Sequence, residues 1–69
     1  MIAVKGDVMD YVEFKGEKYP VDYKLSEGYT HAIVWINGRK ITKSSRGLDE
    51  KGALQGIRNQ LNAEENFRL

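Results

Sequence analysis

The chain has 69 residues, no cysteine and a single histidine, so one small hydrophobic core must hold its fold without disulfides or a metal site. A formal net charge of +1 is nearly neutral, which argues against a strong general nucleic-acid binder. No apolar stretch approaches the roughly 20 residues of a membrane-spanning helix, and the apolar run before Lys5 is too short for a signal peptide. We therefore expect one cytoplasmic domain over residues 1–69, without cofactor or metal and not in a membrane, with 1–7 and 63–69 as flexible ends.

The first half of the chain predicts a β-hairpin. Apolar and polar side chains alternate along residues 8–25, and the segment 15–18 supplies the turn. A turn with Gly16 and Glu17 at its tip pairs apolar side chains across the two strands, namely Phe14 with Tyr19 and Val12 with Val21. Because Pro20 has no N–H to donate to a ladder, we expect its strand to lie at an edge of the sheet.

A second hairpin follows at residues 31–36 and 39–43. Asn37-Gly38 lies between the two runs, and this dipeptide is the preferred two-residue hairpin turn because both of its residues accept a positive φ. Such a turn fixes the cross-strand pairs as Ile36 with Arg39, Trp35 with Lys40, Val34 with Ile41 and Ile33 with Thr42.

The last predicted element is a helix that begins after Asp49, a plausible N-cap. Leu48 and Ala53 are placed to form a hydrophobic staple across this cap. Apolar residues recur at helical spacing on one stripe, which should pack on the sheet: Ala53, Leu54, Ile57 and Leu61. We expect the helix to fray near Asn62.

Two glycines, Gly52 and Gly56, are predicted to lie on the face of this helix opposite the apolar stripe. Each costs about 0.5–1 kcal/mol relative to alanine. Either tertiary packing outweighs this cost, which we favour, or the backbone of another chain approaches the helix there.

Together these elements predict an α+β fold, a three- or four-stranded antiparallel meander of two hairpins with one C-terminal helix packed on one face. Residues 2–5 are a candidate for an additional short strand. Because His31 is the single histidine and no nucleophile is paired with a base, we expect no enzyme.

The face of the sheet away from the helix is the first candidate site. If Val34 points into the core, alternation turns aromatic and aliphatic side chains outward, and these are the predicted partner-binding residues: Tyr11, Tyr29, His31, Ile33 and Trp35. A sheet covered by one helix ordinarily has a polar second face, so such residues are typical of a binding surface. The opposite facing, with Ile33 and Trp35 in the core, remains open, as does coverage of this face by the C-terminal residues.

A basic segment is the second candidate site. Residues 31–48 contain no aspartate or glutamate and four cationic side chains, Arg39, Lys40, Lys43 and Arg46. Arg39 and Lys43 share a face with Ile41, whereas Lys40 lies on the face of Trp35. Such a hairpin is suited to contacting phosphates, although cations on an exposed hairpin also protect a sheet edge from aggregation.

Two functions follow from these surfaces. The first is a small regulator or inhibitor, monomeric or homodimeric, that binds a protein partner through the aromatic and aliphatic face; small chains of this kind are frequent among phage and mobile-element accessory proteins. The alternative is a nucleic-acid-binding module that uses the basic hairpin 39–46.

Overall fold

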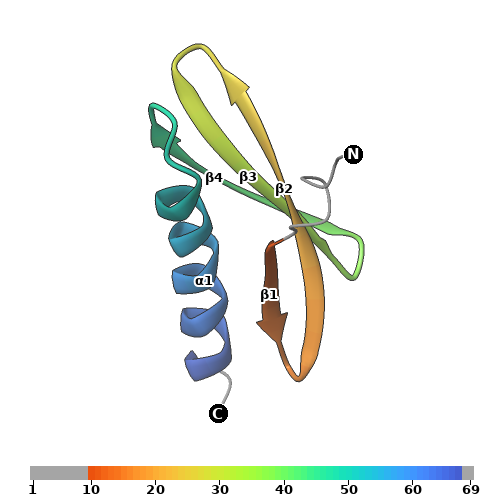
Figure 1. The fold of residues 1–69 in the computed structure, drawn as a ribbon. Coiled ribbons are helices and arrows are strands. Elements are labelled where there is room, and N and C mark those ends of the chain that lie inside the picture. The colour runs from red at the N-terminus through yellow and green to blue at the C-terminus, as the bar shows by residue number, and fades with distance from the viewer. Residues whose placement is uncertain (1–9, 68–69) are drawn as a thin grey trace.

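The computed structural model describes residues 10–67, and its architecture is the α+β meander that the sequence predicts (Figure 1). Within these residues four antiparallel strands form one sheet in the order β1-β2-β3-β4, and a helix follows. The elements are β1 (Asp10–Phe14), β2 (Glu17–Ser26), β3 (Tyr29–Ile36), β4 (Arg39–Arg46) and α1 (Glu50–Phe67). The strand considered at residues 2–5 lies outside the described residues.

All three hairpins close through a two-residue turn that ends in glycine. The φ angles of the turn residues are 53° and 83° at Lys15-Gly16, 53° and 81° at Glu27-Gly28, and 52° and 82° at Asn37-Gly38. Positive φ at both positions defines the turn type whose twist matches that of the flanking strands. The Asn37-Gly38 turn produces the predicted register, and the four cross-strand pairs expected for this hairpin are confirmed.

The predicted register of the first hairpin is wrong by two residues. The tip is Lys15-Gly16, so Val12 lies opposite Tyr19 and Phe14 opposite Glu17. Glycine thereby takes the second turn position, and the backbone N–H of Lys15 donates to Glu65 Oε2 at 2.6 Å. Because side chains alternate with a period of two, this slip leaves the inward-facing residues on the same face.

The expectation that Pro20 places its strand at an edge is also wrong, because β2 is an interior strand. However, β1 pairs with Glu17–Val21 of β2, whereas β3 pairs with Asp22–Ser26. Figure 1 shows β1 beside one half of the long strand β2, and β3 beside the other half. The ladder between β2 and β3 thus ends before Pro20. The missing N–H of Pro20 therefore removes no hydrogen bond from that ladder.

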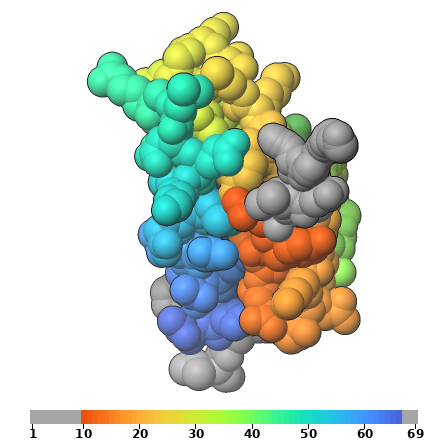
Figure 2. All heavy atoms as spheres, in the orientation of Figure 1, coloured from red at the N-terminus to blue at the C-terminus, as the bar shows by residue number. Residues whose placement is uncertain are grey.

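The core lies between the sheet and α1. The helical stripe of Ala53, Leu54, Ile57 and Leu61 is buried, as predicted. It packs on strand residues that all face the same side, namely Val12, Phe14, Val21, Ala32, Val34, Ile36 and Ile41. In the space-filling view the blue atoms of α1 lie directly against the orange atoms of the β1–β2 hairpin (Figure 2).

Gly56 lies against β4 instead of facing outward, contrary to the expectation from the helical pattern, whereas Gly52 is exposed but borders the side chains of Asp49 and Ser45. A Cβ at Gly56 would lie 3.1 Å from Lys43 Cβ, and one at Gly52 would lie 2.9 Å from Ser45 Oγ and collide with the Asp49 carboxylate. Both glycines therefore let α1 approach β4 closely. The close approach to these glycines, considered above for the backbone of another chain, is made by β4 of the same chain.

The N-terminus of α1 is capped by Asp49, as predicted. Its Oδ1 accepts a hydrogen bond from the Gly52 N–H at 3.0 Å, and its Oδ2 accepts one from Ser45 Oγ at 2.6 Å. These two bonds, that of Ser45 first, hold the pKa of Asp49 below its usual value. The staple with Ala53 does not form, because Leu48 is 84% exposed.

The helix continues to Phe67 instead of fraying near Asn62. The reason is tertiary, because side chains of its last turns bind the sheet. Arg39 of β4 forms an ion pair with Glu64 at 2.7 Å, and Glu65 accepts the Lys15 N–H. Residues 63–67, expected to be a flexible end, therefore belong to α1.

The hydroxyl of Thr30 joins β3 to the segment between β4 and α1. Thr30 is buried, donates to the Gly47 carbonyl at 2.5 Å and accepts a hydrogen bond from the Asp49 N–H at 3.2 Å. The Gly47 N–H in turn donates to the Gly28 carbonyl at 2.7 Å. These bonds fix where the chain leaves the sheet and enters the helix.

Replacing Thr30 by valine keeps the shape of the side chain and removes the hydroxyl. We expect the free energy of unfolding to fall by about 1–3 kcal/mol, because the Gly47 carbonyl and the Asp49 N–H lose their partner. Urea unfolding followed by circular dichroism measures this change. Thr42→Val, at an exposed position of β4, is the matched control and should change stability by less than about 0.5 kcal/mol. Equal losses in both variants would contradict the role given to Thr30.

Candidate functional site

Alternation along β3 places four side chains on the side of the sheet away from α1. Tyr29 is 43% exposed and Trp35 57% exposed, and His31 and Ile33 between them are half-buried. The intervening residues, Thr30, Ala32, Val34 and Ile36, are buried against the helix side. The facing with Val34 inward is therefore confirmed, and the opposite facing, with Ile33 and Trp35 in the core, is excluded.

A polar row on β4 lies beside this apolar row. The register pairs Tyr29 with Arg46, His31 with Ser44, Ile33 with Thr42 and Trp35 with Lys40. All four β4 side chains are exposed hydrogen-bond donors, and none is acidic. These eight residues form what we call the outer face.

At both ends of the outer face a cation is the cross-strand neighbour of an aromatic residue. Lys40 Nζ lies 5.9 Å from the centre of the Trp35 ring, within the range of a cation–π contact. At the other end Arg46 is the cross-strand neighbour of Tyr29. In the middle, His31 Nδ1 and Ser44 Oγ share a hydrogen bond of 2.6 Å. The outer face therefore has an aromatic–cation pair at each end and hydrogen-bonding groups between them.

Strand β2 contributes a residue that the sequence reasoning missed. Lys24 lies opposite His31, and Asp22 lies opposite Ile33, both on the outward side of β2. Lys24 adds a third cation beside the outer face, and Asp22 places one carboxylate on the same flank. The Glu27-Gly28 turn carries the information needed to find Lys24, because a two-residue turn at that position fixes the register of β2 and β3.

Three of the predicted site residues lie outside the eight residues of the outer face. Tyr11 is 47% exposed and points away from the core, as predicted, because its neighbour Val12 is buried; it belongs to the β1–β2 ladder, where it pairs with Pro20, and not to the β3–β4 rows. Arg39 and Lys43 occupy the other face of β4, as alternation predicts. Lys43 packs its stem near Gly56, and the basic segment is thus divided between the two faces.

The contact between Arg39 and Glu64 explains why the first of these cations is structural. The guanidinium donates two hydrogen bonds to the carboxylate, at 2.7 and 3.1 Å. Arg39 first, and then the amide of Gln60, hold the pKa of Glu64 below its usual value. The charge of Arg39 is therefore paired with the helix, whereas Lys40 projects from the outer face.

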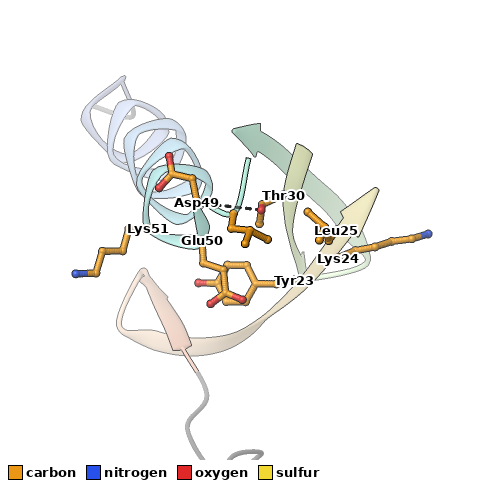
Figure 3. A pocket seen from close by; sticks show the side chains of 8 residues that line it. Tyr23, Lys24, Leu25, Thr30, Asp49, Glu50 and Lys51 are labelled. Atoms are coloured by element: carbon orange, nitrogen blue, oxygen red, sulfur yellow. Dashed lines mark hydrogen bonds between the residues drawn. The ribbon is translucent and has the colours of Figure 1, made fainter. Parts of the chain in front are cut away.

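An open groove of about 510 Å³ lies on the helix side, next to the N-terminus of α1. Tyr23, Leu25 and Leu48 provide its apolar lining, and Figure 3 shows Lys24 and Lys51 extending away from it. The Tyr23 hydroxyl donates to Asp10 Oδ2 at 2.5 Å. Burial, followed by this hydrogen bond, raises the pKa of Tyr23. The groove thus has a mixed lining, since Asp49, Glu50 and Lys51 also border it, and its tyrosine hydroxyl is already hydrogen-bonded within the chain.

The described part of the chain holds no group of three or more histidine, cysteine, aspartate or glutamate side chains arranged to bind a metal ion. Over the same residues, no helix has the length and apolar character needed to cross a bilayer. Comparisons of the chain with protein-family models, curated proteins and solved structures return no match. Function must therefore be argued from the chemistry of the surfaces themselves.

The outward position of Trp35 has a direct consequence for stability. Trp35→Ala should lower the free energy of unfolding by no more than about 1 kcal/mol, since the side chain is mostly exposed. Ile36→Ala, one residue along the same strand, should lower it by about 2–5 kcal/mol because Ile36 is buried. Urea unfolding of the two variants provides the comparison, and a larger loss for Trp35→Ala would contradict the facing of β3.

Proposed function

We propose that the protein is a non-enzymatic module that binds nucleic acid through the outer face. The observation that supports this proposal most is the row of apolar and aromatic side chains on β3 beside an acid-free row of donors on β4. Aromatic side chains stack on bases, and lysine, arginine and hydroxyl groups contact phosphates. The two surfaces that the sequence proposed separately thus become one, although only Lys40 and Arg46 of the basic segment belong to it.

Local charge favours the same ligand. Lys40 and Arg46 belong to the outer face and Lys24 lies beside it, whereas Asp22 is the one carboxylate placed next to its β3 row among the cross-strand neighbours. At physiological ionic strength exposed charges act over about 8 Å. A ligand therefore responds to the local excess of positive charge at the outer face more than to the near-neutral charge of the whole chain. The outer face is therefore suited to a polyanion with flat, stackable groups.

A protein partner is the second proposal, either as the target of a regulator or inhibitor or as a second copy of the chain. This proposal is supported by the exposed side chain of Trp35, which lies on the same outward row of β3 as Ile33, since aromatic residues are enriched in interfaces. For the compartment, the absence of cysteine supports a reducing environment, and we propose the cytoplasm.

Two double variants that remove the same charge test the main proposal. Lys40→Gln/Arg46→Gln removes both β4 cations of the outer face, whereas Arg39→Gln/Lys43→Gln removes two from the opposite face. We expect the first to weaken binding of a mixed-sequence oligonucleotide by about tenfold or more. Its salt dependence should also flatten by about 0.7 to 0.9 in log K per log salt for each phosphate that the variant no longer neutralises. Fluorescence anisotropy of a labelled oligonucleotide at several salt concentrations measures both.

The second double variant is the control. It loses the ion pair with Glu64 and is slightly less stable, but it should retain most of the affinity. Equal weakening by both variants would show a response to total charge and contradict a specific outer face. No binding by the unaltered protein would leave the protein-partner proposal in its place.

A further inference from the structure

We infer that the outer face takes single-stranded nucleic acid rather than a duplex, with one base stacked on Tyr29 and another on Trp35; this inference rests on the proposed function. The two rings lie at opposite ends of β3, both on the outward side and both substantially exposed. Each has a cation as its cross-strand neighbour, Arg46 for Tyr29 and Lys40 for Trp35.

The exposed rings favour a ligand with accessible base faces. In a duplex the faces of the bases are stacked on one another, and only their edges reach the grooves. An unpaired strand presents whole base faces, which are the groups that aromatic side chains bind by stacking. Trp35 and Tyr29 would contribute little to a duplex complex but directly to a single-stranded one.

The small number of cations leads to the same ligand. Three side chains, Lys24, Lys40 and Arg46, are placed to neutralise phosphates along the outer face, and Asp22 offsets one of them. Proteins whose affinity for duplex DNA comes largely from counterion release can make about 6–10 phosphate contacts. With so few cations, base stacking has to supply a large part of the affinity, and this requires a single strand.

The spacing of the rings sets the length of the site. Tyr29 and Trp35 are six residues apart on one strand, which corresponds to about 20 Å. An extended single strand covers that span with about four nucleotides, at the lower end of known single-strand site sizes. Between the two stacked bases the strand would pass the hydroxyls of Ser44 and Thr42 and the ring of His31. Lys40, now close to the Trp35 ring, is positioned to contact the phosphate next to the stacked base.

Trp35 is the only tryptophan of the chain, so its fluorescence reports directly on the site. The experiment titrates the full chain with an eight-nucleotide oligothymidine, with a two-nucleotide one, and with a blunt-ended duplex that has no unpaired bases. We expect the longer single strand to quench the fluorescence in a saturable manner and to bind at least about tenfold more tightly than the duplex. The two-nucleotide ligand is too short to reach both rings and should bind weakly.

A pair of tyrosine variants provides the matched control. Tyr29→Ala should weaken single-strand binding by about tenfold, whereas Tyr11→Ala removes a similarly exposed tyrosine from the β1–β2 ladder and should leave it unchanged. Trp35→Phe should retain most of the affinity and Trp35→Ala should lose it, both measured by anisotropy of a labelled oligonucleotide.

The alternative results separate this inference from the proposed function. Duplex binding that equals or exceeds single-strand binding, and that depends on Lys40 and Arg46, would overturn the inference and keep the proposed function. Single-strand binding without quenching and without an effect of Tyr29→Ala would overturn the stacking of bases. Binding of neither ligand would overturn both proposals and favour a protein partner for the outer face.

Discussion

The structure depends on three two-residue turns that hold positive φ at both positions. Each turn fixes which residue of one strand lies opposite which residue of the next, and in a sheet with a period of two this also fixes which side chains face the helix. The turns at Lys15-Gly16, Glu27-Gly28 and Asn37-Gly38 are alike in this respect. With so small a core, a shift of one residue in any of them would expose buried groups and bury charged ones. The identity of the outer face is therefore set by the same turns that set the fold.

Strand β4 shows the consequence most directly, because its two faces perform different tasks. One alternate set packs against or binds α1: Arg39, Ile41, Lys43 and Ser45. The other set is exposed and forms the donor row of the outer face: Lys40, Thr42, Ser44 and Arg46. A nearly neutral chain thus obtains a locally cationic surface without concentrating all of its basic residues there. Gly52 and Gly56 serve the first of these tasks, since they let the helix lie close to the strand.

How much the sequence predicts varies along the chain, for physical reasons. The hairpin at Asn37-Gly38 and the inward face of the helix follow from local rules, because the preferred turn dipeptide and the helical stripe have few alternatives. In the first hairpin Gly16 fits either of two turn positions, and the structure places it second, as the glycines of the other two hairpins are placed. The end of α1 lies beyond Asn62 because Glu64 and Glu65 of its last turns contact residues of the first and third hairpins, far away in the sequence. The contact of the glycine side of α1 with β4 was not predicted, because strand alternation and helical periodicity each describe a single element and do not say which elements lie side by side.

The candidate site shows a similar division. The outward positions of Tyr29, His31, Ile33 and Trp35 follow from alternation once Val34 is taken as buried. The position of Lys24 opposite His31 follows from the Glu27-Gly28 turn, a local signal that the sequence reasoning did not use. The pairing of Arg39 with Glu64 depends on a contact between two elements and cannot be found in a single segment. Both change the number of cations that a ligand on the outer face can reach.

The most direct test of the outer face as a binding site is a nuclear magnetic resonance titration of isotopically labelled protein with a short single-stranded oligonucleotide. The largest chemical-shift changes are expected at the indole N–H of Trp35 and at the backbone of Tyr29, Lys40 and Ser44. Helix α1 and the β1–β2 turn should change little. Changes concentrated on α1 or on the groove near Leu48, with the outer face unaffected, would contradict binding at the outer face.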